Sequence, residues 1–290
     1  MRLVLISIVL AVASLVMGCN GQKSKKDKGS ADTTPDKEAY SDEELLDSVQ
    51  YQTFNYFWDG AEPVSGLARE RFHMDNVYPN HDKDIITTGG SGFGLMAILV
   101  GVERNFITRE QALERYERIV DFLEKADRFH GAWPHWLLPS GKVSPFSRKD
   151  NGGDLVETAF LVQGLLAVKE YFKDGNEREQ KLAEKIQQLW EGVEWDWYTK
   201  NGEDVLYWHW SPEYKWEMNF PVGGYNECLI MYVLAAASPI MGWKRNSTTT
   251  NMTTLPWGRS SGHIILIWDW TQRVLPINSG TIGSSIPTMP

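Results

Sequence analysis

Cysteine is scarce in this sequence, which contains only Cys19 and Cys228. If Cys19 is lipidated, no disulfide is available, and Cys228 is expected to be a buried thiol. Basic stripes, glycine-rich phosphate loops after a strand and paired cysteine ligands are lacking as well. The net charge of −9 argues against nucleic acids and polyanionic substrates as partners. The six histidines do not fall at zinc-ligand spacing, so we predict neither a catalytic metal nor a cofactor.

The N-terminus has the pattern of a bacterial lipoprotein signal. An apolar stretch follows Met1-Arg2, and Val16-Met-Gly-Cys19 fits a lipobox. We therefore predict a signal peptide over residues 1–19, lipidation at Cys19 and a location in the cell envelope, with the lipid anchor as the only membrane contact. A plain signal peptide or a short membrane anchor is the alternative. Residues 20–40 are polar without apolar periodicity, which is typical of a disordered tether.

Helical periodicity dominates from residue 41 to residue 238. Ser41 with Glu44, and Thr108 with Gln111, have the spacing of capping boxes. We predict six helices and few strands beyond short hairpin-like pieces near 195–220, which makes the fold class all-α. The last helix is nearly apolar all round and is expected to be buried. Five of the predicted helices span residues 41–58, 91–104, 153–172, 178–193 and 224–237, and another opens at Thr108 and includes Leu123.

An acidic run, Asp150-Asn-Gly-Gly-Asp154-Leu-Val-Glu157, opens the fourth predicted helix. Acids at i, i+4 and i+7 of a helix share one face. Like charges held close together raise the pKa of one member, so that a carboxylic acid can stay protonated near neutral pH. The plainer interpretation is that Asp150 or Asp154 only caps the helix.

Tryptophan is abundant around this run, and nine of the 13 residues fall between positions 58 and 216. Aromatic rings can cover the apolar face of a sugar while carboxylates, amides and histidines bind its hydroxyls. Carboxylates among indoles therefore suggest a glycan cleft, although about half of these rings are expected to be core. In the segment Trp208-His209-Trp210, an extended backbone would point the two indoles one way and the imidazole the other.

Several longer motifs resemble one known family. They occur in order as Gly66-Leu-Ala-Arg-Glu-Arg71, Thr88-Gly-Gly-Ser-Gly-Phe-Gly94, Gly131-Ala-Trp-Pro-His135, the 150–160 run, Trp208-His-Trp-Ser-Pro212, Trp216-Glu-Met-Asn219 and Gly224-Tyr-Asn-Glu-Cys228. Residues 41–238 resemble the bacterial glycoamylase-like group, similar to family 144 of the glycoside hydrolases. The resemblance implies an (α/α)6 toroid and an anomer-inverting endo-β-1,2-glucanase that acts on a neutral glucan. With six helices of twelve, the toroid would be incomplete.

An inverting glycosidase needs two carboxyl groups about 6.5–9.5 Å apart. Asp154 and Glu157 are too close in the simplest geometry, whereas Asp150 and Glu157 would lie about 10 Å apart along the axis if both were helical. Glu217 or Glu227 could otherwise supply a partner. We expect the catalytic residues to be Asp150, Asp154, Glu157 and Glu227. The expected substrate-binding residues are Arg69, Arg71, Trp133, His135, Trp136, Trp208, His209, Trp210, Trp216, Glu217, Asn219, Tyr225 and Asn226. Capping by Glu227 and surface ion pairing by the two arginines are the plainer alternatives.

The chain changes character beyond Ser238. Residues 240–290 contain five charged residues and 14 Ser or Thr, without a helical period. A shift of reading frame near Ile240 is one hypothesis, because displaced codons can yield runs similar to the C-terminal half of the family. Residues 239–290 are thus expected to be an atypical tail. Three alternatives to a β-1,2-glucanase stay open at this stage: a surface glycan-binding lipoprotein, an inactive truncated relative, and a hydrolase for α-glucan.

Overall fold

The computed structural model describes residues 40–224 and 226–242. The chain divides into two compact units, residues 1–41 and 42–290, and every element below belongs to the second. The predicted lipobox and tether, most of the atypical tail and Tyr225 lie outside the described residues. Among the helices of the described ranges, none combines the length and the apolar character that crossing a membrane requires.

The described residues form six α-helices, as predicted. The helix at 88–103 begins three residues before the expected Ser91, and the last begins at Leu229, five residues after the expected Gly224. A 3-10 helix spans Trp197–Thr199. The α-helices are α2 (Asp42–Trp58), α3 (Thr88–Glu103), α4 (Arg109–Lys125), α5 (Leu155–Phe172), α6 (Glu177–Glu191) and α7 (Leu229–Ala237).

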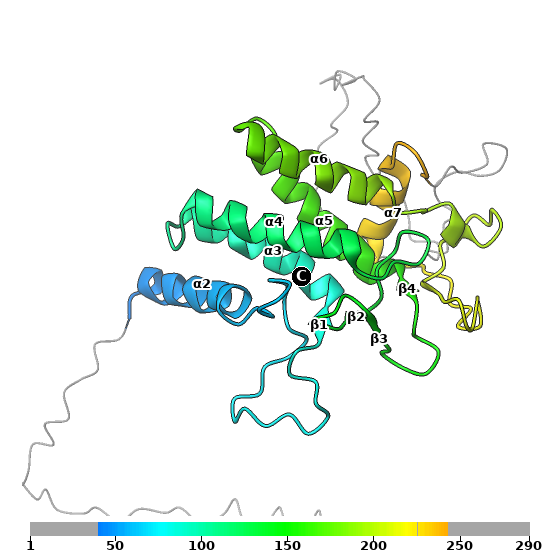
Figure 1. The fold of residues 1–290 in the computed structure, drawn as a ribbon, viewed down its shortest axis with the longest axis horizontal. Helices are drawn as coiled ribbons and strands as arrows, with labels where there is room; N and C mark the ends of the chain where they lie inside the picture. The colour runs from blue at the N-terminus through cyan, green and yellow to red at the C-terminus, as the bar shows by residue number, and fades with distance from the viewer. Residues whose placement is uncertain (1–39, 225, 243–290) are drawn as a thin grey trace, which may run out of the picture. The chain divides into compact units, whose positions relative to one another are not determined.

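The helices are arranged in two layers that their sequences anticipate. Helices α3, α5 and α7 are rich in apolar residues, and α5 contacts both α3 and α7. Helices α4 and α6 carry an apolar stripe and a charged face, and they contact each other as well as the apolar layer. Figure 1 shows α2 to α6 stacked side by side, with the short strands and long loops at one end. This is the inner and outer layering of an α/α fold.

Two glycines allow α3 and α5 to pack closely. A Cβ atom on Gly92 would lie 2.1 Å from the carbonyl oxygen of Phe160, and one on Gly164 would lie 2.2 Å from the carbonyl oxygen of Gly92. Any larger side chain would force the two backbones apart. The close contact fixes the starts of α3 and α5 next to each other, which is where the acidic run lies.

Helix caps account for the boundaries of the outer layer. The predicted capping box at Thr108 is confirmed, because its side chain accepts from the Gln111 N–H and the Gln111 side chain accepts in return. Asn176 and Glu179 form a second box at the start of α6. Sequence reasoning began that helix at Arg178 and did not identify this cap.

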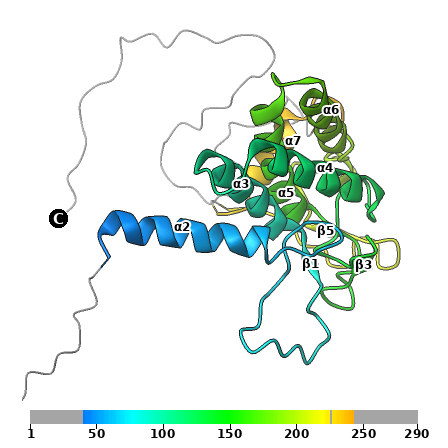
Figure 2. The same ribbon diagram turned by 60° about the vertical axis from the view of Figure 1, so that its left-hand side comes forward.

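The described part of the chain contains five two-residue strands. The strands labelled in Figure 1 and Figure 2 lie at one end of the helices. Strands β1 (Ile86–Thr87), β2 (Trp136–Leu137) and β3 (Val143–Ser144) form an antiparallel sheet that was not predicted. Strand β4 (Gly153–Asp154) pairs with β5 (His209–Trp210), and Asp154 lies opposite His209. Because β1 leads into α3 and β4 into α5, the strands hold the starts of both inner helices.

Part of the apolar layer faces outward in the described structure. Phe93 and Val100 on α3 and Val233 on α7 are about half exposed. The expectation that the last helix is buried on all sides is therefore wrong, because Val233 keeps 52% of its surface exposed. Helix α2 is also loosely covered, since Phe54 is its only buried residue.

Candidate active site

The three acids of the 150–157 run meet, although they do not share a helix face. Helix α5 begins at Leu155, Asp154 is its N-cap, and Asp150 lies in the loop before β4. The prediction of three helical acids and the axial distance based on it were therefore wrong. Strand β4 folds the run back instead, so that oxygens of Asp150 and Asp154 and a ring nitrogen of His135 lie within 4.8 Å of one another.

Asp154 is the centre of this cluster, and its side chain is only 1% exposed. Its Oδ1 accepts hydrogen bonds from the backbone N–H groups of Val156 (3.0 Å) and Glu157 (2.9 Å). Its Oδ2 accepts from Trp208 Nε1 (2.7 Å) and lies 3.1 Å from His135 Nδ1. The capping interpretation is thus confirmed, and the same carboxylate also orients an indole and an imidazole.

Asp150 is buried, and its pKa is raised to about 7. Burial is the main cause, and the negative charges of Asp154 and Glu157 add to it, whereas His135 acts in the opposite direction. Asp150 Oδ1 lies 3.3 Å from Nε2 of His209, which is itself buried. Asp150 is therefore mostly protonated below about pH 7.

Glu157 is the most open of the three acids, because its residue is partly exposed while the other two are buried. Its Oε2 accepts a hydrogen bond from the backbone N–H of Gly89 at 2.8 Å. A Cβ on Gly89 would lie 2.4 Å from that oxygen, so the contact requires glycine. Burial and the charge of Asp154 raise the pKa of Glu157. Glu157 can thus hold a proton and meet a ligand.

His135 lies beside the acids at the start of β2, and 21% of its side chain is exposed. Burial lowers the pKa of this imidazole, but the hydrogen bond to Asp154 and the charges of the carboxylates outweigh it. The pKa of His135 is therefore raised. The ring of Phe146 packs against the imidazole with centroids 4.3 Å apart. His135 is thus a positively polarised group at the edge of an acidic cluster.

Sequence reasoning missed Glu70. Its Oε2 accepts a hydrogen bond from Trp136 Nε1 at 3.0 Å, and its charge contributes to the raised pKa of Glu157. Arg71 Nη2 lies 3.5 Å from Glu70 Oε1, and Arg71 Cζ lies 5.9 Å from the centroid of the Trp136 ring. The position of Glu70 between two expected binding residues, Arg69 and Arg71, was the signal that could have identified it.

Two residues expected to bind substrate are part of the scaffold. Trp133 is fully buried and donates from Nε1 to the Leu123 carbonyl oxygen at 3.3 Å, so the prediction that its ring contacts a sugar was wrong. Arg69 donates from Nη1 to the carbonyl oxygens of Gly60 and Ala61 and pairs with Asp84. Both side chains hold loops together.

Other expected residues lie apart from the acids in what the structure describes. Glu217 is exposed and binds Lys149 at 2.6 Å, and Asn219 accepts from Lys200. Glu227 is exposed, and no contact joins it to the acidic cluster within the described residues. Asn226 caps the turn before α7, because its Oδ1 accepts from the Cys228 N–H. The predicted catalytic role of Glu227 is thus without support from this geometry.

The aromatic residues of 197–216 divide between core and surface. The predicted alternation in β5 is confirmed, since His209 is buried while Trp208 and Trp210 are partly exposed. Trp210 contacts His130 and Trp197 edge to face, and Trp216 packs against Trp197. Of this set, Trp208 touches the acidic cluster directly through Asp154.

His135, Asp150 and Asp154 are close enough together to contact one cation. The hydrogen bonds of Asp154 argue against a cation at this position, because each Asp154 oxygen already has two N–H groups as neighbours. A carboxylate oxygen offers about two lone-pair sites, which leaves none free on Asp154 for a metal.

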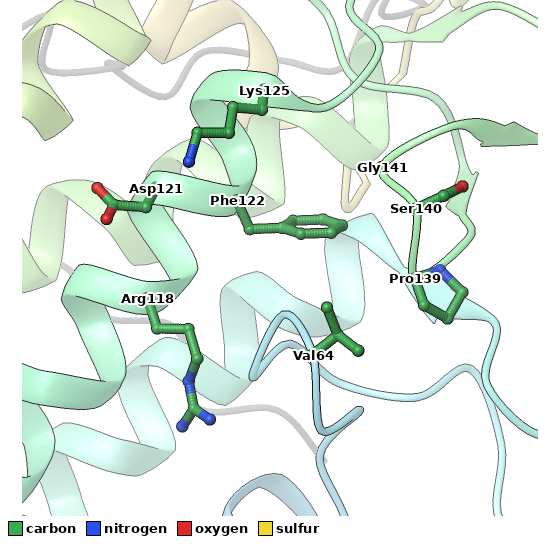
Figure 3. Close-up of a pocket in the computed structure, with 8 residues that line it drawn as sticks. All are labelled: Val64, Arg118, Asp121, Phe122, Lys125, Pro139, Ser140 and Gly141. Carbon is green, nitrogen blue, oxygen red and sulfur yellow. The ribbon is translucent and has the colours of Figure 1, made fainter.

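An open cavity of about 390 Å³ lies elsewhere, along α4 (Figure 3). The Phe122 ring extends from α4 toward Pro139 and Val64, with Arg118 and Lys125 at the rim. None of the residues around the acidic cluster lines this cavity, so it is separate from the candidate site.

The chain is similar to proteins that act on β-1,2-glucans. A curated exo β-1,2-glucooligosaccharide sophorohydrolase (non-reducing end) of Parabacteroides distasonis is 46% identical over 231 residues, which cover 76% of this chain and 31% of that protein. The structure of an endo-β-1,2-glucanase from Chitinophaga pinensis with sophorotriose and glucose matches with a TM-score of 0.69 and 66% identity, over 70% of this chain and 49% of that one. A β-1,2-glucanase structure from Parabacteroides distasonis has a TM-score of 0.66 and 49% identity, over 70% and 29%.

No family model matches the chain. The chain spans about a third of the curated relative and about half of the Chitinophaga enzyme. The similar structures confirm the predicted fold class for the part that is covered, which is a portion of an α/α toroid. The resemblance of the motifs is confirmed too: the chain is a homologue, over part of their length, of the glycoamylase-like glycoside hydrolases that act on β-1,2-glucans.

Proposed function

We propose that this protein is a glycoside hydrolase for β-1,2-glucan or its oligosaccharides, and that the acidic cluster at the start of α5 carries the reaction. The observation that supports it most directly is a buried network in which two carboxyl groups, Asp150 and Glu157, have raised pKa values around the hydrogen-bonded Asp154. Glycosidases need one carboxyl group that stays protonated near neutral pH. The similarity to β-1,2-glucan hydrolases, one of them solved with sophorotriose, supports the β-1,2 linkage.

Glu157 is our candidate for proton transfer, because it alone of the three acids is partly exposed. Asp154 is assigned to orientation, since its oxygens face N–H donors from the helix start, Trp208 and His135. An inverting reaction also needs a second carboxylate to activate water. Glu70 is a partly exposed acid whose charge contributes to the raised pKa of Glu157, and we propose it as the carboxylate that activates water.

The test is hydrolysis by the purified protein of linear β-1,2-glucooligosaccharides of defined length. We expect new reducing ends, with the α-anomer formed first if the reaction inverts, as read by proton NMR. Glu157→Gln and Glu70→Gln should each lower turnover on the order of 10²-fold or more, the range for loss of a general acid or base. Starch, which carries α-linkages, is the control substrate and should not be cleaved.

Glycan binding without cleavage is the second candidate function. It is favoured by the burial of Asp150 and Asp154, which leaves few acids free to meet a sugar. Calorimetric titration with the same oligosaccharides separates the two. If the wild type binds the oligosaccharides without forming product, and Glu157→Gln leaves the affinity unchanged, binding replaces hydrolysis as the function.

A further inference from the structure

The buried pair of Asp150 and His209 is not explained by the proposed roles. His209 lies in β5, and its Nε2 is 3.3 Å from Asp150 Oδ1. Both side chains are buried, with 1% or less of their surface exposed. Neither residue can meet a ligand directly in this conformation, so any effect on chemistry must act through their neighbours.

The backbone fixes the protonation of the imidazole. The Gly152 N–H donates to His209 Nε2 at 3.1 Å, so this nitrogen must carry a lone pair. A neutral imidazole with a lone pair on Nε2 has its proton on Nδ1. Burial also lowers the pKa of His209 to about 4, against a smaller opposite effect of Asp154. His209 is therefore a neutral acceptor at physiological pH.

The carboxyl group of Asp150 has no donor to stabilise a negative charge. Neither of its buried oxygens accepts a hydrogen bond from a described residue. An ionised carboxylate in that position would be costly, and it would face the lone pair of Nε2. Among the charged groups facing Asp150, Asp154 and Glu157 oppose ionisation, and His135 favours it. A proton on Oδ1 removes the conflict, because the acid can then donate to Nε2 and share its single lone pair with the Gly152 N–H in a three-centre hydrogen bond.

We propose that His209 is a positioning residue that holds Asp150 as a neutral carboxylic acid through an Oδ1–H···Nε2 hydrogen bond. The acidic cluster then carries one buried negative charge fewer than it would with both aspartates ionised. The carboxylate of Asp154 is the one that contacts the helix N-terminus, Trp208 and His135. The link from this charge state to catalysis rests on the proposed function, whereas the charge state itself does not.

Infrared spectroscopy of the purified full chain tests the charge state directly. A C=O band of a protonated carboxyl should be present in the wild type at pH 6 and disappear in Asp150→Asn. In His209→Leu, the titration midpoint of that band should fall, because the neutral acid loses its acceptor. In His209→Gln, whose amide oxygen can accept the same proton, the midpoint should stay close to that of the wild type.

The proposal is overturned if no protonated-acid band depends on Asp150, or if the midpoint in His209→Leu equals or exceeds that of the wild type. Nitrogen NMR of the wild-type histidines covers the case in which the leucine variant does not fold. We expect the neutral His209 ring with its proton on Nδ1, and an imidazolium or an Nε2–H form at pH 7 would contradict the proposal.

Hydrolysis measured on the same samples separates the two levels. An Asp150 band that behaves as expected in a protein without hydrolysis would refute the proposed function and leave the positioning role intact. Hydrolysis without such a band would support the proposed function and refute the positioning role of His209. If both hold, the alkaline limit of the pH–rate profile should move to lower pH in His209→Leu and recover in His209→Gln.

Discussion

Replacing Asp154 with asparagine separates its capping role from its role in the cluster. The amide oxygen can still accept from the Val156 and Glu157 N–H groups, so the helix cap is kept. The amide nitrogen then faces Trp208 Nε1, which is a donor only, so the indole N–H and the amide N–H opposite it are both left without an acceptor. His135 can change tautomer and accept, so its contact is retained. The expected loss of folding free energy is about 1–3 kcal/mol.

The same change should lower hydrolysis on the order of 10²-fold, the range for misplaced groups, because the ring of Trp208 and the charge state of His135 are no longer fixed. Denaturant unfolding followed by circular dichroism measures the first quantity, and release of oligosaccharides measures the second. Thr108→Ala is the matched control, since it removes a cap on outer helix α4 and should cost about 1 kcal/mol with turnover unchanged. If Asp154→Asn unfolds like the wild type and stays within a few-fold in turnover, Asp154 is only a cap.

Gly89→Ala should place a methyl group against Glu157 Oε2 and reduce turnover with little loss of helix α3, as judged by thermal melting beside the kinetic assay. Asp150 has a folded-state pKa of about 7 against an ordinary 3.8, so it should stabilise the fold at low pH. That contribution to the free energy of unfolding should be lost as pH rises from about 4 to 7, by on the order of 4 kcal/mol at most. Urea titrations of Asp150→Asn should lack this pH dependence. Phe93, Val100 and Val233 should make the purified chain bind a hydrophobic dye, and dye fluorescence no higher than that of a compact control protein would contradict this. We also propose lipid anchoring at Cys19, so labelled fatty acid should attach to the wild type, and Cys19→Ala should release the protein from membranes.

Periodicity and capping patterns were sufficient to predict the helices. Alternating apolar and charged residues along α4, together with Thr108 and Gln111, determine that helix locally, so the sequence predicted it closely. The error at α7 has a different origin. Gly224 to Cys228 are compatible with a helix, but the Asn226 side chain bonds the Cys228 N–H and favours a turn. Such local competition is not visible in the apolar pattern.

The sequence predicted the three acids and His135 of the candidate site, but it predicted neither Glu70 nor the geometry. The run 150–157 identified the acids, but a helical period cannot reveal that β4 pairs with β5 and turns Asp150 away from the helix. The same pairing brings His209 opposite Asp154 from more than fifty residues away. Trp133 shows the limit for aromatic residues, because composition does not distinguish an indole in the core from one in a cleft.

The two layers of the fold explain why the site lies where it does. Close packing at Gly92 and Gly164 aligns the starts of α3 and α5, so the Gly89 N–H of one helix meets the Glu157 carboxylate of the next. Strand β4 then places Asp154 at the N-terminus of α5, where the helix dipole stabilises an anion. That position surrounds the buried Asp154 carboxylate with N–H donors, whereas burial raises the pKa values of Asp150 and Glu157. A glycosidase needs the same asymmetry between carboxyl groups, and here it follows from helix packing and one short pair of strands.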